Sequence, residues 1–125
     1  MYANLSTIHT YLGYVVVVVV LVATLLAFRS GSQEAPVSRL TALTMVLLDV
    51  HVTVGIALYL VGQWWTQVDA NLLVAVVHPT LAILALAAGH IGIGRARREH
   101  NPRIAAWGIA TALILVTAAI GVASV

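Results

Sequence analysis

Residues 14–28 read YVVVVVVLVATLLAF, a stretch with almost no polar atoms in its side chains. The apolar run that contains it extends from about residue 5 to residue 28 and is closed by Arg29. About 20 apolar residues in a helix cross the hydrocarbon core of a bilayer. Valine favours strands in water, but a lone apolar run of this length in a bilayer forms a helix, because its backbone polar groups must be satisfied internally. This run predicts a transmembrane helix.

The rest of the chain has the same character. Of the 125 residues, 62% are hydrophobic and 8% are charged, which is typical of an integral membrane protein. Three further apolar runs lie at about 40–62, 72–93 and 104–125. The predicted fold is therefore all-α, an integral membrane up-and-down four-helix bundle. We expect residues 1–125 to form a single transmembrane domain with spans at about 5–28, 40–62, 72–93 and 104–125.

Composition also narrows the chemistry. The chain has no cysteine, so thiolate ligands, iron–sulfur clusters and covalent c-type haem attachment are excluded. We find no phosphate-binding loop and no nucleophile–base pair, and therefore do not expect hydrolysis or group transfer. Whether the protein is an enzyme stays open at this stage.

The distribution of positive charge predicts the orientation. All six basic residues are arginines, and they fall in the turn between the first two spans or the turn between the last two. Short arginine-rich turns mark the cytoplasmic side of the inner membrane. Both termini are then expected outside the cytoplasm, together with the turn that begins at Trp64 and Trp65. Topology explains the net charge of +2, so no nucleic-acid partner is expected.

Three histidines lie inside predicted spans in the half of the bilayer nearer the outer face, where an imidazole is costly unless its nitrogens have partners. At about 1.5 Å of rise per residue, His9 lies about 6 Å, His78 about 9 Å and His51 about 16 Å from the outer interface. The first and third helices of such a bundle face each other across its core. His9 and His78 are therefore predicted axial ligands of a haem b, with one imidazole on each side of the iron.

Two further residues bear on this predicted site. His51 becomes a ligand if its helix shifts by one turn, and Gly55, one turn away on the same face, would leave space for a flat macrocycle. The alternatives are that His9 is interfacial, that His51 bonds a helix carbonyl, and that Pro79 merely kinks the helix after His78.

Asp49 is a second intramembrane polar residue, about 13 Å from the cytoplasmic interface by the same rise. It does not share a helical face with His51. It is predicted to act in a proton relay or to make a cross-helix hydrogen bond to the region of His90. We interpret His90 and His100 as loop or interfacial residues. The small residues of the third span predict packing surfaces, within the bundle or between protomers; they are Ala85, Ala88, Gly89 and Gly92.

The segments IHTYLGY, HVTVGIALYLVG and VVHPTLAILALAAGHIGIGRARRE resemble a family of small bacterial four-helix membrane proteins described as cytochrome b-like. More distantly they resemble one half of the heme A synthase bundle. His9, residues 55–59 and His78 with Pro79 match the family pattern. Val77 and His51 depart from it, since the family has an acidic residue and a glutamine at those positions. The resemblance implies a membrane haem site near His9 and His78.

Three functions follow as expectations. In the first, the protein is a b-type haem protein with bis-histidine ligation that moves electrons between a membrane quinone and an outer-face partner. In the second, it is a cofactor-free accessory or assembly subunit of a membrane respiratory complex. In the third, His9, His51 and His78 bind zinc or copper. Besides the lipid bilayer, a homodimer or a larger membrane complex is an expected partner.

Overall fold

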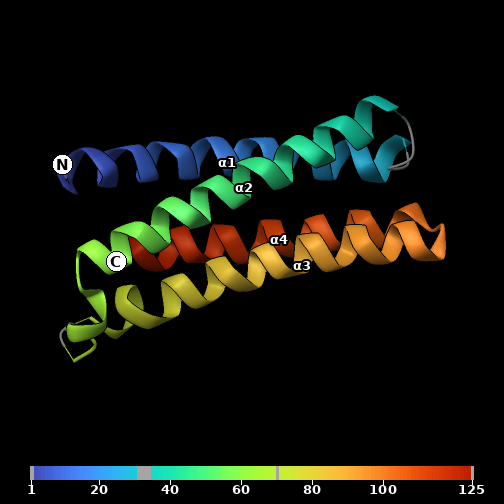
Figure 1. Ribbon diagram of the computed structural model, residues 1–125. Helices are drawn as coiled ribbons and strands as arrows, with labels where there is room; N and C mark the ends of the chain where they lie inside the picture. The colour runs from blue at the N-terminus through green and yellow to red at the C-terminus, as the bar shows by residue number, and fades with distance from the viewer. Residues whose placement is uncertain (1, 31–34, 70, 125) are drawn as a thin grey trace.

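The computed structural model describes residues 2–30, 35–69 and 71–124, and within these ranges the chain is helical and contains no strand. Four long helices and two short helical turns follow one another (Figure 1). In chain order they are α1 (Tyr2–Ser30), α2 (Ala35–Val61), η1 (Trp64–Thr66), η2 (Leu73–Val77), α3 (His78–Glu99) and α4 (Pro102–Ala123). The predicted all-α four-helix bundle is confirmed.

Four helical segments are long and apolar enough to cross a membrane. They are Ala3–Arg29, Ser38–Val61, Leu73–Glu99 and Pro102–Ala123. The outer surface of the bundle carries large apolar side chains, among them Tyr11, Trp107 and Ile114, as expected of helices that face lipid. The chain is a multi-pass membrane protein, as predicted.

The helices extend further into the polar segments than the sequence predicts. Helix α3 continues to Glu99, so Arg95, Arg97 and Arg98 lie on its last turns and not in a turn between helices. Arg95 and Glu99 form an ion pair of 3.0 Å one helical turn apart, and positive side chains are favoured near a helix C-terminus. The helix ends at His100, whose backbone is left-handed with φ of 49°.

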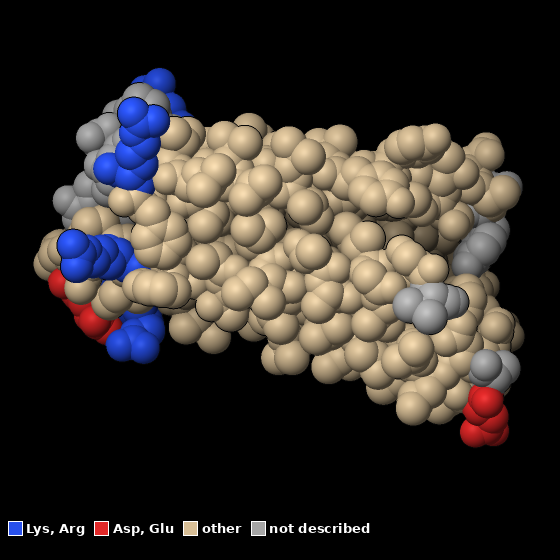
Figure 2. Space-filling model, turned by 180° about the vertical axis from the view of Figure 1, so that it is seen from behind, with Lys and Arg blue, Asp and Glu red and all other residues tan. Residues whose placement is uncertain are grey.

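The helices form two hairpins, α1–α2 and α3–α4, which meet along α1 and α4 (Figure 1). Helices α2 and α3 share the least contact of the four neighbouring pairs. Both termini lie at one end of the bundle, which we call the terminal end. The arginines gather at the opposite end, the arginine end (Figure 2).

Small residues of α3 bring the two helices of the second hairpin close together. A Cβ atom added at Gly92 would lie 2.6 Å from the Cα atom of Gly108 on α4. One added at Gly89 would lie 2.7 Å from the Sδ atom of Met45 on α2. Ala85 is also buried, so these small residues pack within the bundle.

The tightly packed core does not fill the whole bundle. Its side chains come from all four helices, and the largest of those that are fully buried are Leu48, Ile109, Val16, Val20 and Val116. Toward the terminal end a cavity lies between the hairpins, lined by residues of all four long helices. The fold thus places its free internal space at the terminal end.

Candidate functional site

His9, His51 and His78, which we call the histidine cluster, meet between the two hairpins near the terminal end. The rings of His9 and His51 are stacked, with centroids 4.2 Å apart and an angle of 4° between their planes. The ring of His78 meets that of His9 edge-on, with centroids 6.1 Å apart and an angle of 82°. The three predicted histidines are therefore neighbours.

The rings of His9 and His51 are stacked, whereas helical rise per residue predicts that the two histidines lie at different depths in the membrane. Helix α2 crosses α1 obliquely (Figure 1), and an imidazole reaches away from its own backbone. The rings meet although His51 was expected about 10 Å deeper than His9 by helical rise. No shift of α2 by a turn is needed to bring His51 into the cluster.

Two glycines make room for the stacked rings. A Cβ atom added at Gly55 on α2 would lie 2.9 Å from Cε1 of His9, and one added at Gly13 on α1 would lie 3.1 Å from Cε1 of His51. Each histidine thus packs against the glycine one turn beyond the other histidine. The ring of His9 fills the space that we predicted Gly55 would leave for a macrocycle. Sequence reasoning missed Gly13, although His-x-x-x-Gly occurs at both 9–13 and 51–55.

His78 is held by a hydrogen bond to the opposite helix of its hairpin. Its Nδ1 atom lies 2.8 Å from the backbone oxygen of Ala119 on α4. Because a carbonyl only accepts, Nδ1 carries the proton and Nε2 has a free lone pair. This arrangement orients metal-binding histidines, since the bond at one nitrogen fixes which nitrogen is left to ligate.

The backbone before His78 is unusual. The turn η2 (Leu73–Val77) is a π-helix, and the N–H of His78 bonds to the oxygen of Leu73. Pro79 has no N–H with which to bond Ala75 one α-helical turn earlier, so the widened turn accommodates it. Such π-helical turns occur frequently at functional sites.

Two nitrogens of the cluster lack protein partners. Within the described residues, Nδ1 of His9 and Nδ1 of His51 are buried and make no hydrogen bond. An unsatisfied buried polar atom costs about 1–3 kcal/mol, and a bound ligand or ion is one standard explanation. The two unpartnered nitrogens therefore point toward a bound group at the cluster.

The cavity between the hairpins, which we call the slot, has a volume of about 560 Å³. His9 and His51 lie on the wall formed by α1 and α2, and His78 lies on the wall formed by η2, α3 and α4. Most of the other lining residues are apolar, and Tyr14, Tyr59 and Trp64 add aromatic surface. Volumes of about 300–1,000 Å³ with few polar groups are typical of cofactor sites.

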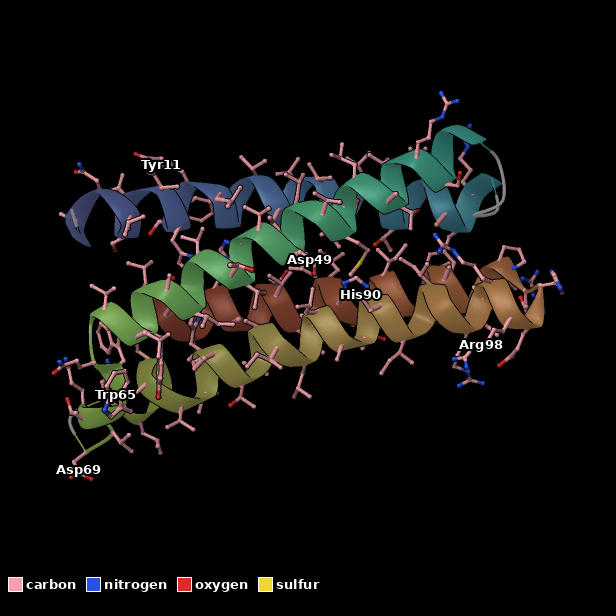
Figure 3. All side chains as sticks on the ribbon, in the orientation of Figure 1. Tyr11, Asp49, Trp65, Asp69, His90 and Arg98 are labelled. Carbon is pink, nitrogen blue, oxygen red and sulfur yellow. The ribbon has the colours of Figure 1, made fainter. Side chains whose placement is uncertain are left out.

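Asp49 lies outside the slot. Its Oδ1 atom is 3.0 Å from Nε2 of His90 on α3, and Figure 3 shows the two side chains between α2 and α3. The predicted cross-helix hydrogen bond from Asp49 to the His90 region is confirmed. The interpretation of His90 as a loop residue is wrong, because it lies inside α3, more than two turns before Glu99.

The cluster does not have the geometry of a three-imidazole metal site. Among the described residues, no group of three histidine or acidic side chains is placed to hold a metal ion. Because the rings of His9 and His51 lie face to face, their nitrogens do not converge on one point. His100 is far from the cluster, at the end of α3.

A haem fits these residues better than a bare ion does. The slot has histidines from both hairpins, a largely apolar lining and one histidine, His78, whose Nδ1 atom is held by the backbone oxygen of Ala119. The two unpartnered nitrogens are consistent with a bound group. The fold and site define a multi-pass membrane bundle with a histidine cluster in which His51 is buried and His9 and His78 are half-buried. Searches with this chain against protein-family models, curated proteins and solved structures find no match.

Proposed function

We propose that this protein is a membrane-bound b-type haem protein that transfers electrons between a membrane quinone and a partner on the outer face. The observation that carries the proposal is the pair His9 and His78, which come from different hairpins and whose rings meet edge to face in the slot with centroids 6.1 Å apart. These two residues would hold the haem, and His78 would do so through Nε2, because its Nδ1 atom is bonded to the backbone oxygen of Ala119.

His9 and His78 would hold a haem better than His9 and His51 would. The rings of His9 and His51 are parallel and stacked 4.2 Å apart, so they leave no space between them for a bound group. In this proposal His51 supports His9 by stacking, and Ala119 orients His78 through Nδ1. The haem iron supplies a one-electron couple between its ferric and ferrous states. The apolar lining excludes water and so influences the reduction potential.

The orientation of the chain in the membrane determines on which side the electron acceptor would lie. We infer that the arginine end faces the cytoplasm of a cell whose inner membrane holds the protein. The termini and the slot then lie toward the outer face. A haem held at the histidine cluster would therefore lie close to an electron acceptor at that face.

The absorption spectrum of the detergent-purified protein tests the proposal. We expect a Soret band that shifts on reduction with dithionite, with sharp α and β bands. His78→Ala should lose at least nine tenths of the bound haem, because it removes an axial ligand. His100→Ala should retain all of it, since this residue lies at the end of α3. Protein absorbance alone, after expression with added haem, would contradict the proposal.

A cofactor-free accessory subunit is the second candidate function. It is favoured by the packing of His9 and His51 against glycines and by the hydrogen bond of His78 to Ala119, because histidines that join helices need no cofactor. Under this function His78→Ala would cost about 0.6 kcal/mol, the average for a hydrogen bond between membrane helices. The spectrum of the parent protein separates the two candidates.

A further inference from the structure

We propose that Asp49 and His90 bind the headgroup of a lipid-soluble quinone in the seam between α2 and α3. By the α2–α3 seam we mean residues 49, 52 and 56 of α2 and 83, 86 and 90 of α3. The inference rests on the proposed electron-transfer function and names the place where its membrane partner would bind.

The pair is unusual because it faces the outside of the bundle within the spans. The side chains of His90 and Asp49 are 53% and 45% exposed, and both residues lie inside helices that can cross a membrane. Ionisable side chains at this depth almost always face a protein interior or a water-filled cavity. A polar molecule from the lipid phase would remove the cost of leaving this pair against hydrocarbon.

The hydrogen-bonding atoms of the pair determine what it can bind. With His90 Nε2 bonded to Asp49 Oδ1, the second ring nitrogen of His90, Nδ1, can donate a hydrogen bond and the second carboxyl oxygen of Asp49, Oδ2, can accept one. The structure shows no protein partner for either atom among the residues it describes.

A quinone headgroup is complementary to this donor and acceptor. The carbonyl oxygen of the oxidised form accepts a hydrogen bond from Nδ1 of His90. The hydroxyl of the reduced form accepts the same bond and donates one to Oδ2 of Asp49. Both oxidation states therefore find partners, as required of a carrier that binds in one state and leaves in the other.

The seam connects the pair with the slot. Residues 49, 52 and 56 recur at helical spacing on one face of α2, and residues 83, 86 and 90 do so on α3. Val52, Ile56 and Ile83 also line the slot. A flat ring bonded to the pair would thus lie about one helical turn along α2, and about two turns along α3, from the cavity assigned to the haem. Its apolar tail would remain in lipid.

A second copy of the chain is a poorer occupant of this surface. Close approach of membrane helices needs small residues at the contact. Gly94 lies one turn along α3 from His90 and borders open space, but the pair itself is flanked by the exposed side chains of Val46, Val50 and Ile91. These side chains would hold another helix away from the pair, whereas a small headgroup fits between them.

Binding of decylubiquinone to the full-length protein in detergent tests the site directly. We expect His90→Leu to weaken binding of the oxidised form at least tenfold, because the donor is lost. Asp49→Asn should weaken binding of the reduced form at least fivefold. The matched control is Glu99→Gln, which breaks the other ion pair of α3, between Arg95 and Glu99, and should bind as the parent does. Circular dichroism and the haem spectrum of each variant establish that it is folded.

The outcomes separate this inference from the proposed function. Equal binding by the parent and His90→Leu, or no binding by the parent, would overturn the quinone site. So would light scattering that shows a parent dimer and a monomeric His90→Leu, since a second copy would then cover the pair. A protein without haem whose decylubiquinone binding still depends on His90 would keep the site and refute the haem proposal.

Discussion

The packing of the histidine cluster depends on the glycines beside its rings. His9 has room for its ring because Gly55 has no side chain, and the added Cβ atom at 2.9 Å would be too close. We expect Gly55→Ala to lower the free energy of unfolding by about 1–3 kcal/mol, the usual cost of overpacking. The variant should also lose haem, because His9 must move. The control Gly121→Ala adds a methyl group in open space. Thermal unfolding followed by circular dichroism would measure both, and equal midpoints would contradict the close packing.

Part of this site was predictable from single residues. Polar side chains in apolar runs identified the three histidines and Asp49, because such groups need partners in a bilayer. The stacking of His51 on His9 was not predictable from rise along straight helices, since it depends on the tilt of α2 and the reach of two rings. Gly13 could have been found from the repeated His-x-x-x-Gly spacing alone. The function as a haem protein and the function as a cofactor-free subunit both stay predictions.

Among the elements, α3 and α4 form the most closely packed pair of helices. A side chain at Gly92 would meet backbone, the Cα atom of Gly108 at 2.6 Å, and backbone cannot rotate away. We therefore expect Gly92→Val to destabilise the protein by about 3 kcal/mol, at the upper end for overpacking, and to lower haem content. Gly94→Val, two residues along the same helix, enters open space and should leave both unchanged. Similar unfolding temperatures for the two variants would refute the close α3–α4 crossing.

Element type was easier to predict than element ends. Long apolar runs allow only helices here, and four were found. The third predicted span ended too early, because hydropathy falls where charged residues begin. Helix α3 instead continues through Arg95, Arg97 and Arg98 to Glu99. Ion pairing along the helix and the favourable position of cations at its C-terminus stabilise these polar turns. The π-helical turn at Leu73–Val77 had one signal in the sequence, Pro79.

For the whole molecule, charge and internal space lie at opposite ends. The arginines mark one end (Figure 2), and the slot with its histidine cluster lies toward the other. If the arginine end is cytoplasmic, Gln67 in the turn after α2 faces outward and Arg98 faces inward. Because the chain has no cysteine, Gln67→Cys and Arg98→Cys give single labelling sites. We expect a membrane-impermeant maleimide to label Gln67→Cys in sealed right-side-out vesicles and Arg98→Cys only after detergent is added. The reverse pattern would place the histidine cluster near the cytoplasm, and the electron acceptor would then have to be a cytoplasmic protein.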